Sequence, residues 1–179
     1  MVRFLNNSVG ILGGSFDPVH KGHLMISKIA IKKVKLSKVL WVVTKQNPFK
    51  GKTFYSLNQR IKKARKITKS TKKIQVMYLD KVASSSRSIN ILRYLISKKK
   101  LKNIYYIIGS DNLINFHKWK SWKKIVKLTK LVVFSRKGYD KKSKKSKVAK
   151  YLKKNIIFIK IKPILVSSTK LRNRSEINY

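Results

Sequence analysis

Short apolar runs recur along the chain and alternate with segments that space their apolar residues as on one face of a helix. The runs lie at residues 9–12, 39–43, 74–79, 104–108, 131–134 and 156–161. Strands separated by helices usually pair in parallel, because each helical connection returns the chain to the same end of the sheet. The pattern therefore predicts an α/β protein with a doubly wound parallel sheet. A length of 179 residues fits a single domain with a substantial core.

Glycine or polar residues come soon after four of these runs. Gly13 and Gly14 follow the first run, Thr44 the second, Gly109 the fourth and Arg136 the fifth. Ligands of doubly wound sheets bind beyond the carboxyl ends of the strands, where such residues meet. We therefore expect a ligand site at this edge of the sheet.

The first of these strand ends carries the strongest chemical signal. Its two glycines lack a Cβ and let a phosphate approach the backbone, and apolar residues at helical spacing begin at Leu24. The start of that helix offers unpaired N–H groups and a partial positive charge, which favour an anion. His20 and His23 fall in its first turn. A strand, a glycine turn and a histidine-bearing helix together predict a site for a nucleoside triphosphate.

Two histidines three residues apart also occur by chance, as exposed helix residues or as half of a metal site. The metal alternative is the weaker one, because the chain has three histidines, no cysteine and five acidic residues. A structural or catalytic zinc site draws three or four ligands from these residue types. We therefore expect no metal site built from side chains alone.

The charge of the chain is extreme and would ordinarily suggest a nucleic-acid partner. Lysine and arginine number 46 and give a net charge of +41. The basic residues are spread through almost every segment, and lysines outnumber arginines 38 to 8, a bias that A/T-rich codons produce. We expect weak, salt-sensitive association with polyanions but no specific nucleic-acid partner. The lysine-rich stretch at residues 141–154 is predicted to be a solvated helix or loop.

Nothing in the sequence pattern predicts an export signal or a membrane segment. Lysines interrupt every later apolar run well before the ~20 residues that a membrane-spanning helix needs. The chain has no cysteine and therefore no disulfide framework. We expect a cytoplasmic protein with no membrane partner, and the sequence predicts no particular oligomeric state.

Three segments carry a resemblance to known enzymes. GGSFDPVHKGH at residues 13–23 resembles the signature of the nucleotidylyltransferase superfamily, whose H-x-G-H element is His20-Lys21-Gly22-His23 here. VSSTKLR at residues 166–172 resembles the C-terminal ISSTxIR element of that superfamily. IIGSDNLINFHKWKSWKKI at residues 107–125 resembles nicotinate-nucleotide adenylyltransferases, as do residues 47–50 and 134–139. The resemblance covers nearly the whole chain and implies a Rossmann-like fold of nucleotidylyltransferase type.

The resemblance also implies a reaction and its residues. The reaction is adenylyl transfer from ATP to nicotinate mononucleotide, which gives deamido-NAD and pyrophosphate in NAD biosynthesis. The resemblance assigns catalysis to His20 and His23, and acceptor binding to Lys50, Ser88 and Trp119, whose ring would stack on the pyridine. The residues implied in ATP binding are Gly13, Gly14, Ser15, Phe16, Gly109, Asp111, Arg136, Ser168, Thr169 and Arg172. Mg²⁺ would arrive with ATP, held mainly by phosphates and water.

The chain departs from the family near the acceptor and at its end. Arg87 and Ile91 stand where relatives carry tyrosine and threonine, and Phe49 stands where many carry histidine. The sequence stops at Tyr179, so we expect one domain over residues 1–179 without the usual C-terminal helical tail. These departures make adenylyl transfer a firmer expectation than the choice between acid and amide acceptor.

Other interpretations remain open at this point. Phe116, Trp119 and Trp122 also fit a buried helix face, and the hydroxyls of Ser168 and Thr169 also fit a helix N-cap. The alternative functions are another small-phosphate nucleotidylyltransferase, such as one that adenylylates phosphopantetheine, and a non-catalytic basic module of the same fold that binds nucleotides or RNA.

Overall fold

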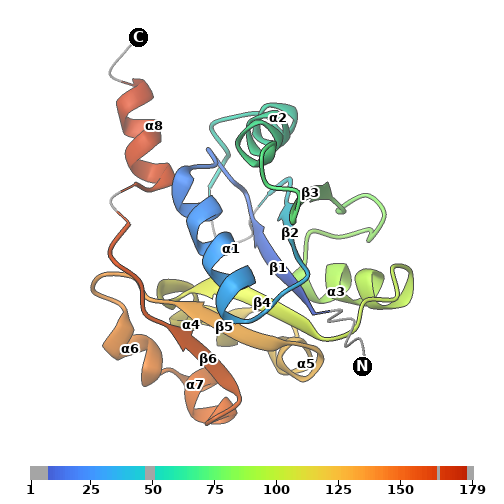
Figure 1. The fold of residues 1–179 in the computed structure, drawn as a ribbon, viewed down its shortest axis with the longest axis vertical. Helices are drawn as coiled ribbons and strands as arrows, with labels where there is room; N and C mark the ends of the chain where they lie inside the picture. Colours follow the sequence, from blue (N-terminus) through green and yellow to red (C-terminus); the bar gives the residue numbers. More distant parts are fainter. Residues whose placement is uncertain (1–7, 47–50, 165, 177–179) are drawn as a thin grey trace, which may run out of the picture.

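The computed structural model describes residues 8–46, 51–164 and 166–176, with side chains up to residue 173. Six strands form one parallel sheet in the order β3-β2-β1-β4-β5-β6 (Figure 1). The strands are β1 (Val9–Gly14), β2 (Lys38–Val43), β3 (Ile74–Tyr78), β4 (Ile104–Gly109), β5 (Lys130–Phe134) and β6 (Ile156–Ile159). Each corresponds to one of the predicted apolar runs, and the doubly wound parallel sheet is confirmed.

Helices cover both faces of this sheet (Figure 1). They are α1 (Lys21–Lys33), α2 (Leu57–Thr68), α3 (Ser88–Ser97), α4 (Ser110–Asn115), the 3₁₀ helix η1 (Phe116–Lys118), α5 (Trp122–Leu128), α6 (Asp140–Lys144), α7 (Lys147–Leu152) and α8 (Ser168–Glu176). Apolar residues of α1 and α2 pack in one core cluster, and those of α3, α4, α5 and α7 pack in another. Strands buried on both faces read as continuous apolar runs, which is why the runs were visible in the sequence. Among the described helices, none is long and apolar enough to cross a membrane.

The order of the strands reverses beside β1, and this sets the place of the site. From β1 the chain builds outward through β2 to β3, then crosses back so that β4 pairs with the other side of β1. The two strands end at Gly14 and Gly109, on the same edge of the sheet. In doubly wound sheets ligands bind at such a reversal, beyond the carboxyl ends of the strands.

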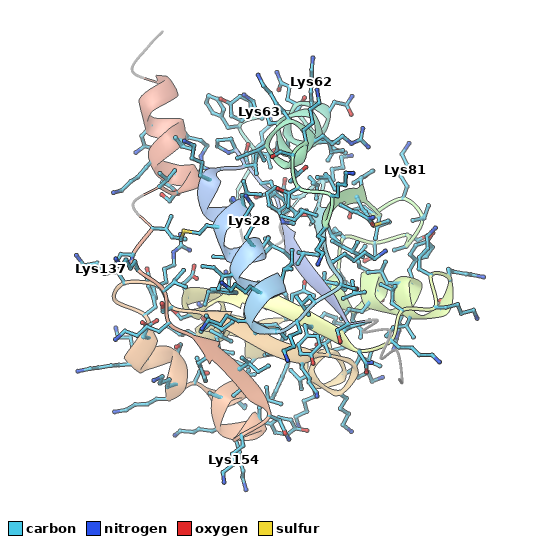
Figure 2. All side chains as sticks on the ribbon, viewed as in Figure 1. Lys28, Lys62, Lys63, Lys81, Lys137 and Lys154 are labelled. Atoms are coloured by element: carbon cyan, nitrogen blue, oxygen red, sulfur yellow. The ribbon has the colours of Figure 1, made fainter. Side chains whose placement is uncertain are left out.

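The lysine-rich stretch at residues 141–154 is only partly solvated. It forms most of α6 and all of α7, and its lysines are exposed, but Val148 and Ala149 are buried in the core, and Ser143 and Ser146 are buried as well. The expectation of a solvated segment was therefore wrong for these four residues, because lysines at the surrounding positions hid a short apolar face. Figure 2 shows Lys62, Lys81, Lys137 and Lys154 at well-separated places around the periphery of the molecule, consistent with a dispersed charge.

Gly10, in the centre of β1, provides a test of how tightly the sheet packs. A Cβ at this position would lie 2.8 Å from Leu36 Cδ1, 2.9 Å from Ile107 Cδ1 and 3.0 Å from Val39 Cγ2. We expect Gly10→Ala to lower the free energy of unfolding by about 1–3 kcal/mol through overpacking, as measured by urea denaturation. Gly51→Ala is the matched control, because a Cβ at Gly51 meets nothing within 4 Å. Equal stabilities for the two variants would contradict the tight packing around β1.

Candidate active site

Gly13, near the end of β1, lies directly against the side chain of Tyr106 on β4. A Cβ on Gly13 would lie 3.0 Å from the hydroxyl oxygen of Tyr106, a buried side chain of β4. Any larger side chain at this position would have to displace the tyrosine or the turn. The absence of a side chain at Gly13 therefore has a local cause in the packing, in addition to the open approach to the backbone that the sequence suggested.

His20 and His23 hold each other in place at the start of α1. His20 is the N-cap residue, and its Nδ1 accepts a hydrogen bond from the Gly22 N–H at 3.1 Å. The Nδ1 of His23 accepts from the His20 N–H at 3.2 Å, and the two ring centroids lie 3.9 Å apart. Since each Nδ1 is an acceptor, a neutral ring carries its proton on Nε2. The first turn of the helix thus fixes the tautomer and the orientation of both imidazoles.

The His20 ring is neutral at physiological pH. Its pKa is lowered to about 4, first by burial and then by the positive charge of Arg136. A neutral imidazole with its proton on Nε2 is a hydrogen-bond donor that leaves the site without a permanent charge on the ring. An incoming phosphate would counteract the effect of Arg136 and stabilise a positive charge on the same ring.

Phe16 supports His23 from the core side. Its backbone has a positive φ of 49°, and its ring is 3% exposed. The ring lies 5.0 Å from the His23 ring and stacks on Trp41 at 5.2 Å between centroids. Because the ring is buried in this way, the side chain of Phe16 acts on the site by packing, and the contact of Phe16 with ATP stays a prediction.

Asp17 is an anchor for a neighbouring loop. Its carboxylate is buried and accepts hydrogen bonds from the N–H groups of Phe54 and Tyr55, at 2.8 and 2.9 Å. These two hydrogen bonds hold the segment before α2 against the histidine turn, the connection at residues 15–23 that carries His20 and His23. The carboxylate that the sequence places within GGSFDPVHKGH therefore shapes the site through the backbone of another loop.

The C-terminal hydroxyl cluster docks on the same turn. Ser168 Oγ donates to the Pro18 carbonyl oxygen at 2.8 Å, and the Arg172 guanidinium donates to the Asp17 carbonyl oxygen at 2.6 Å. Arg172 also lies 3.4 Å from the Thr169 hydroxyl. The two sequence motifs, which lie at opposite ends of the chain, are thus side by side, as the grouping of Ser168, Thr169 and Arg172 with the histidines predicted. Their role toward phosphate stays a prediction.

Arg60 of α2 helps to shape the candidate site, although the sequence pattern did not identify it. Its side chain is fully buried and donates hydrogen bonds to four main-chain carbonyl oxygens, at distances of 2.7 to 3.1 Å. The acceptors belong to Tyr55, Ser15, Thr44 and Lys45. Burial lowers the pKa of this arginine, and the nearby carboxylates of Asp17 and Asp80 oppose the shift. One cation therefore joins the β1 turn, the end of β2 and the loop before α2.

Asp111 and Arg136 form an ion pair across the ends of β4 and β5. Arg136 Nη1 lies 2.5 Å from Asp111 Oδ2, while Oδ1 of Asp111 is buried and makes no hydrogen bond with the described residues. A Cβ on Gly109 would lie 2.4 Å from that Oδ1, so a side chain at this position would force the carboxylate to move. The three predicted nucleotide-binding residues are brought together, with Arg136 close enough to shift the pKa of His20.

A cavity of about 220 Å³ adjoins the histidine turn. Gly13 and Gly14 form part of its wall, and Ser88 and Trp119, two predicted acceptor residues, form another part. Tyr106 connects these parts, since its hydroxyl donates to Ser88 Oγ at 2.9 Å and its ring meets Trp119 edge-on at 6.0 Å. The third predicted acceptor residue, Lys50, lies outside the described residues.

The aromatic residues of the 116–122 segment divide between core and cavity. Phe116 is fully buried, and Trp119 stacks on it at 4.6 Å between ring centroids while also lining the cavity. Trp122 packs edge-on against Tyr151, away from the cavity wall. Trp119 and Trp122 are both partly buried against the core, but the three residues do not share one helix face, because the backbone is extended at Trp119, between η1 and α5. The role of Trp119 toward a ligand stays a prediction.

The carboxylates and histidines of the site do not form a metal centre by themselves. Among the described residues, no group of three or more His, Asp, Glu or Cys side chains is placed to hold an ion. Asp17 is occupied by two N–H donors and Asp111 by Arg136. The expectation that Mg²⁺ arrives with ATP, held mainly by phosphates and water, stays a prediction.

Comparison with known proteins agrees with the geometry. A family model described as "Cytidylyltransferase-like" matches residues 11–174, nearly the whole chain. A Pelagibacter ubique protein named "Probable nicotinate-nucleotide adenylyltransferase" is 47% identical over 165 residues, which cover 92% of this chain and 91% of the relative. A Clostridium novyi protein of the same name is 34% identical, with 95% and 90% covered. The chain belongs to the nicotinate-nucleotide adenylyltransferase family within this class of nucleotidyltransferases.

Solved structures share the fold at low sequence identity. Plasmodium falciparum nicotinic acid mononucleotide adenylyltransferase complexed with NaAD superposes with a TM-score of 0.73 at 18% identity, covering 93% of this chain and 82% of that one. The same enzyme complexed with APC gives a TM-score of 0.72 at 17% identity, with the same coverage. At these identities the likeness establishes the Rossmann-like fold of nucleotidylyltransferase type.

The lowered pKa of His20 predicts a pH dependence of stability. The folded ring has a pKa of about 4 against an ordinary value of 6.5, so the unfolded chain binds more protons between these values. The contribution is fully present above pH 6.5 and is lost as the pH falls toward 4. We expect His20→Asn, which keeps an N-cap acceptor, to lose less stability than the unaltered protein over this range in urea denaturation. Parallel pH profiles for the two proteins would show that His20 does not titrate in this way.

Proposed function

We propose that the chain catalyses adenylyl transfer from ATP to nicotinate mononucleotide, with deamido-NAD and pyrophosphate as products. The observation that best supports this proposal is that Gly13 and Gly14, which lead from β1 toward the histidines, also form part of the wall of the cavity beside Trp119. A triphosphate at the histidines and a mononucleotide in the cavity would meet at Gly13 and Gly14. The names of the relatives, nicotinate-nucleotide adenylyltransferases, support this acceptor.

The proposed reaction is an in-line displacement at the α-phosphorus of ATP. A phosphate oxygen of the acceptor forms a bond to the α-phosphorus, and the bond to the bridging oxygen of pyrophosphate breaks. The attacking phosphate is already anionic, so no general base is required. The site has to position both substrates and stabilise the charge that develops on the phosphate oxygens. His20 and His23 would donate from Nε2 to the oxygens of the α- and β-phosphates, aided by the N-terminus of α1.

The other nucleotide contacts follow from the same arrangement. Ser168, Thr169 and Arg172 would hold the β- and γ-phosphates, and Arg136 would exchange its ion pair with Asp111 for a phosphate. Asp111, once released, could accept a hydrogen bond from a ribose hydroxyl. The backbones of Gly13, Gly14, Ser15, Phe16 and Gly109 would surround the nucleotide at the strand ends.

The acceptor contacts rest on the cavity. Trp119 would stack on the pyridine ring, and Ser88 would supply a hydroxyl and a backbone N–H. Mg²⁺ carried by ATP would offset part of the phosphate charge. We place the reaction in the cytoplasm, where ATP is available.

An assay of pyrophosphate release tests the reaction and its acceptor. With ATP present, we expect release with nicotinate mononucleotide and much slower release with nicotinamide mononucleotide or phosphopantetheine. Phosphopantetheine as the best acceptor would reassign the chain to another small-phosphate transferase. Release with none of the three, together with tight RNA binding at physiological salt, would favour a non-catalytic module.

Histidine variants separate the chemical role of the ring from its structural one. His20→Asn keeps an acceptor at the position of Nδ1 and removes the Nε2–H donor. We expect turnover to fall by roughly 10²–10³ while the melting temperature at neutral pH changes little. His23→Ala should lose as much turnover and also about 0.5–2 kcal/mol of stability, since the His20 N–H loses its acceptor. Lys28→Asn, an exposed change on the same helix, is the control. Near-normal turnover in His20→Asn would remove that ring from the mechanism.

A further inference from the structure

The described charged residues that line the cavity beside the histidine turn are all positive. Arg87, Lys118 and Lys120 contribute to its wall, and no carboxylate occurs among the described residues that line it. A concave surface lined by one sign of charge concentrates the field inside it and favours a ligand of the opposite sign. The cavity is therefore suited to a ligand that carries negative charge.

Arg87 is an exposed cation of this wall whose backbone is anchored on both sides. Its N–H donates to Ser85 Oγ at 3.0 Å, and its carbonyl oxygen accepts from the Asn90 N–H at 3.0 Å. The residue is thereby held as the N-cap of α3, where its side chain makes no capping hydrogen bond. Within the described part of the chain, the guanidinium has no hydrogen bond or ion pair. An anchored backbone with an unused guanidinium at a cavity is suited to binding a ligand.

The side chain of Tyr106 lies between Trp119 and the start of α3, where Arg87 is located. The Tyr106 ring contacts Trp119 edge-on, and the Tyr106 hydroxyl donates to Ser88, the residue that follows Arg87. A planar ring that stacks on Trp119 would thus have its edge directed along Tyr106 toward the start of α3. A substituent on that edge would come within reach of the Arg87 guanidinium.

We propose that Arg87 binds the carboxylate of the pyridine ring and makes this chain selective for the acid mononucleotide over the amide. This inference rests on the function proposed above. A guanidinium matches a carboxylate with two parallel N–H donors, whereas an amide would turn an NH₂ group, itself a donor, toward one of them. Lys118 and Lys120 flank Trp119 and add positive charge, but an ammonium lacks the planar pair of donors.

Steady-state kinetics with both acceptors tests the assignment. The kcat/KM for nicotinate mononucleotide and for nicotinamide mononucleotide are measured at saturating ATP for the unaltered protein, Arg87→Gln and Arg87→Lys. We expect Arg87→Gln to lower the acid-to-amide ratio by about 10- to 100-fold, and Arg87→Lys to lower it less. Arg93→Gln removes one exposed positive charge from the same helix outside the cavity wall and should keep the original ratio. Melting curves confirm that each variant is folded.

Each outcome decides a separate question. An unchanged ratio in Arg87→Gln, or an equal loss with both acceptors, overturns the proposal, because the second result means that Arg87 binds a group common to the two, such as their phosphate. An unaltered protein that prefers the amide also overturns it while leaving adenylyl transfer intact. Turnover with neither mononucleotide refutes the proposed function itself.

Discussion

The buried guanidinium of Arg60 is the interaction on which the geometry of the site depends. Removing a cation from water is costly, and the cost is offset here by hydrogen bonds to four carbonyl oxygens and by the nearby charges of Asp17 and Asp80. Two of these carbonyls belong to Ser15, beside the histidine turn, and Thr44, in the cavity wall. The nucleotide side and the acceptor side therefore share one frame. An in-line transfer requires such a frame, because small displacements of one substrate against the other are expensive in rate.

The histidines combine an observed structural role with the chemical role proposed for them. Their Nδ1 atoms satisfy N–H groups at the start of α1, a task that serine or asparagine performs in most helices. The capping hydrogen bond engages Nδ1 of each ring and therefore places the proton of a neutral ring on Nε2, the atom proposed to donate to phosphate. The pair is thus part of the helix N-cap and is half-buried, and its role toward phosphate stays a prediction that the capping geometry supports. Asp17 differs, since both of its oxygens serve the fold.

The strands and the histidine turn were predictable because each depends on a local pattern: apolar runs for the buried strands, and a contiguous motif for the turn. Arg60 was not, since it lies in a run of basic residues that resembles a solvated face. Its spacing held a signal, because Arg60, Ala64 and Thr68 recur every fourth residue and are the buried positions of α2. The burial of the Phe16 ring and the exposure of Trp119 to the cavity depend on backbone conformation, a positive φ and an extended residue between two helices, which composition does not reveal.

The contrast between arginine and lysine in this chain follows from what each group can do. Lysines outnumber arginines 38 to 8, and a flexible ammonium on the surface needs no particular partner. Of the six arginines with described side chains, Arg60, Arg136 and Arg172 bind oxygen atoms within the site, and Arg87 lines its cavity, while Arg65 and Arg93 are exposed elsewhere. A guanidinium donates in several fixed directions at once, which the four carbonyls around Arg60 require and a lysine could not supply. Arg60, Arg136 and Arg172 therefore occupy positions where the direction of hydrogen bonding matters as well as the charge.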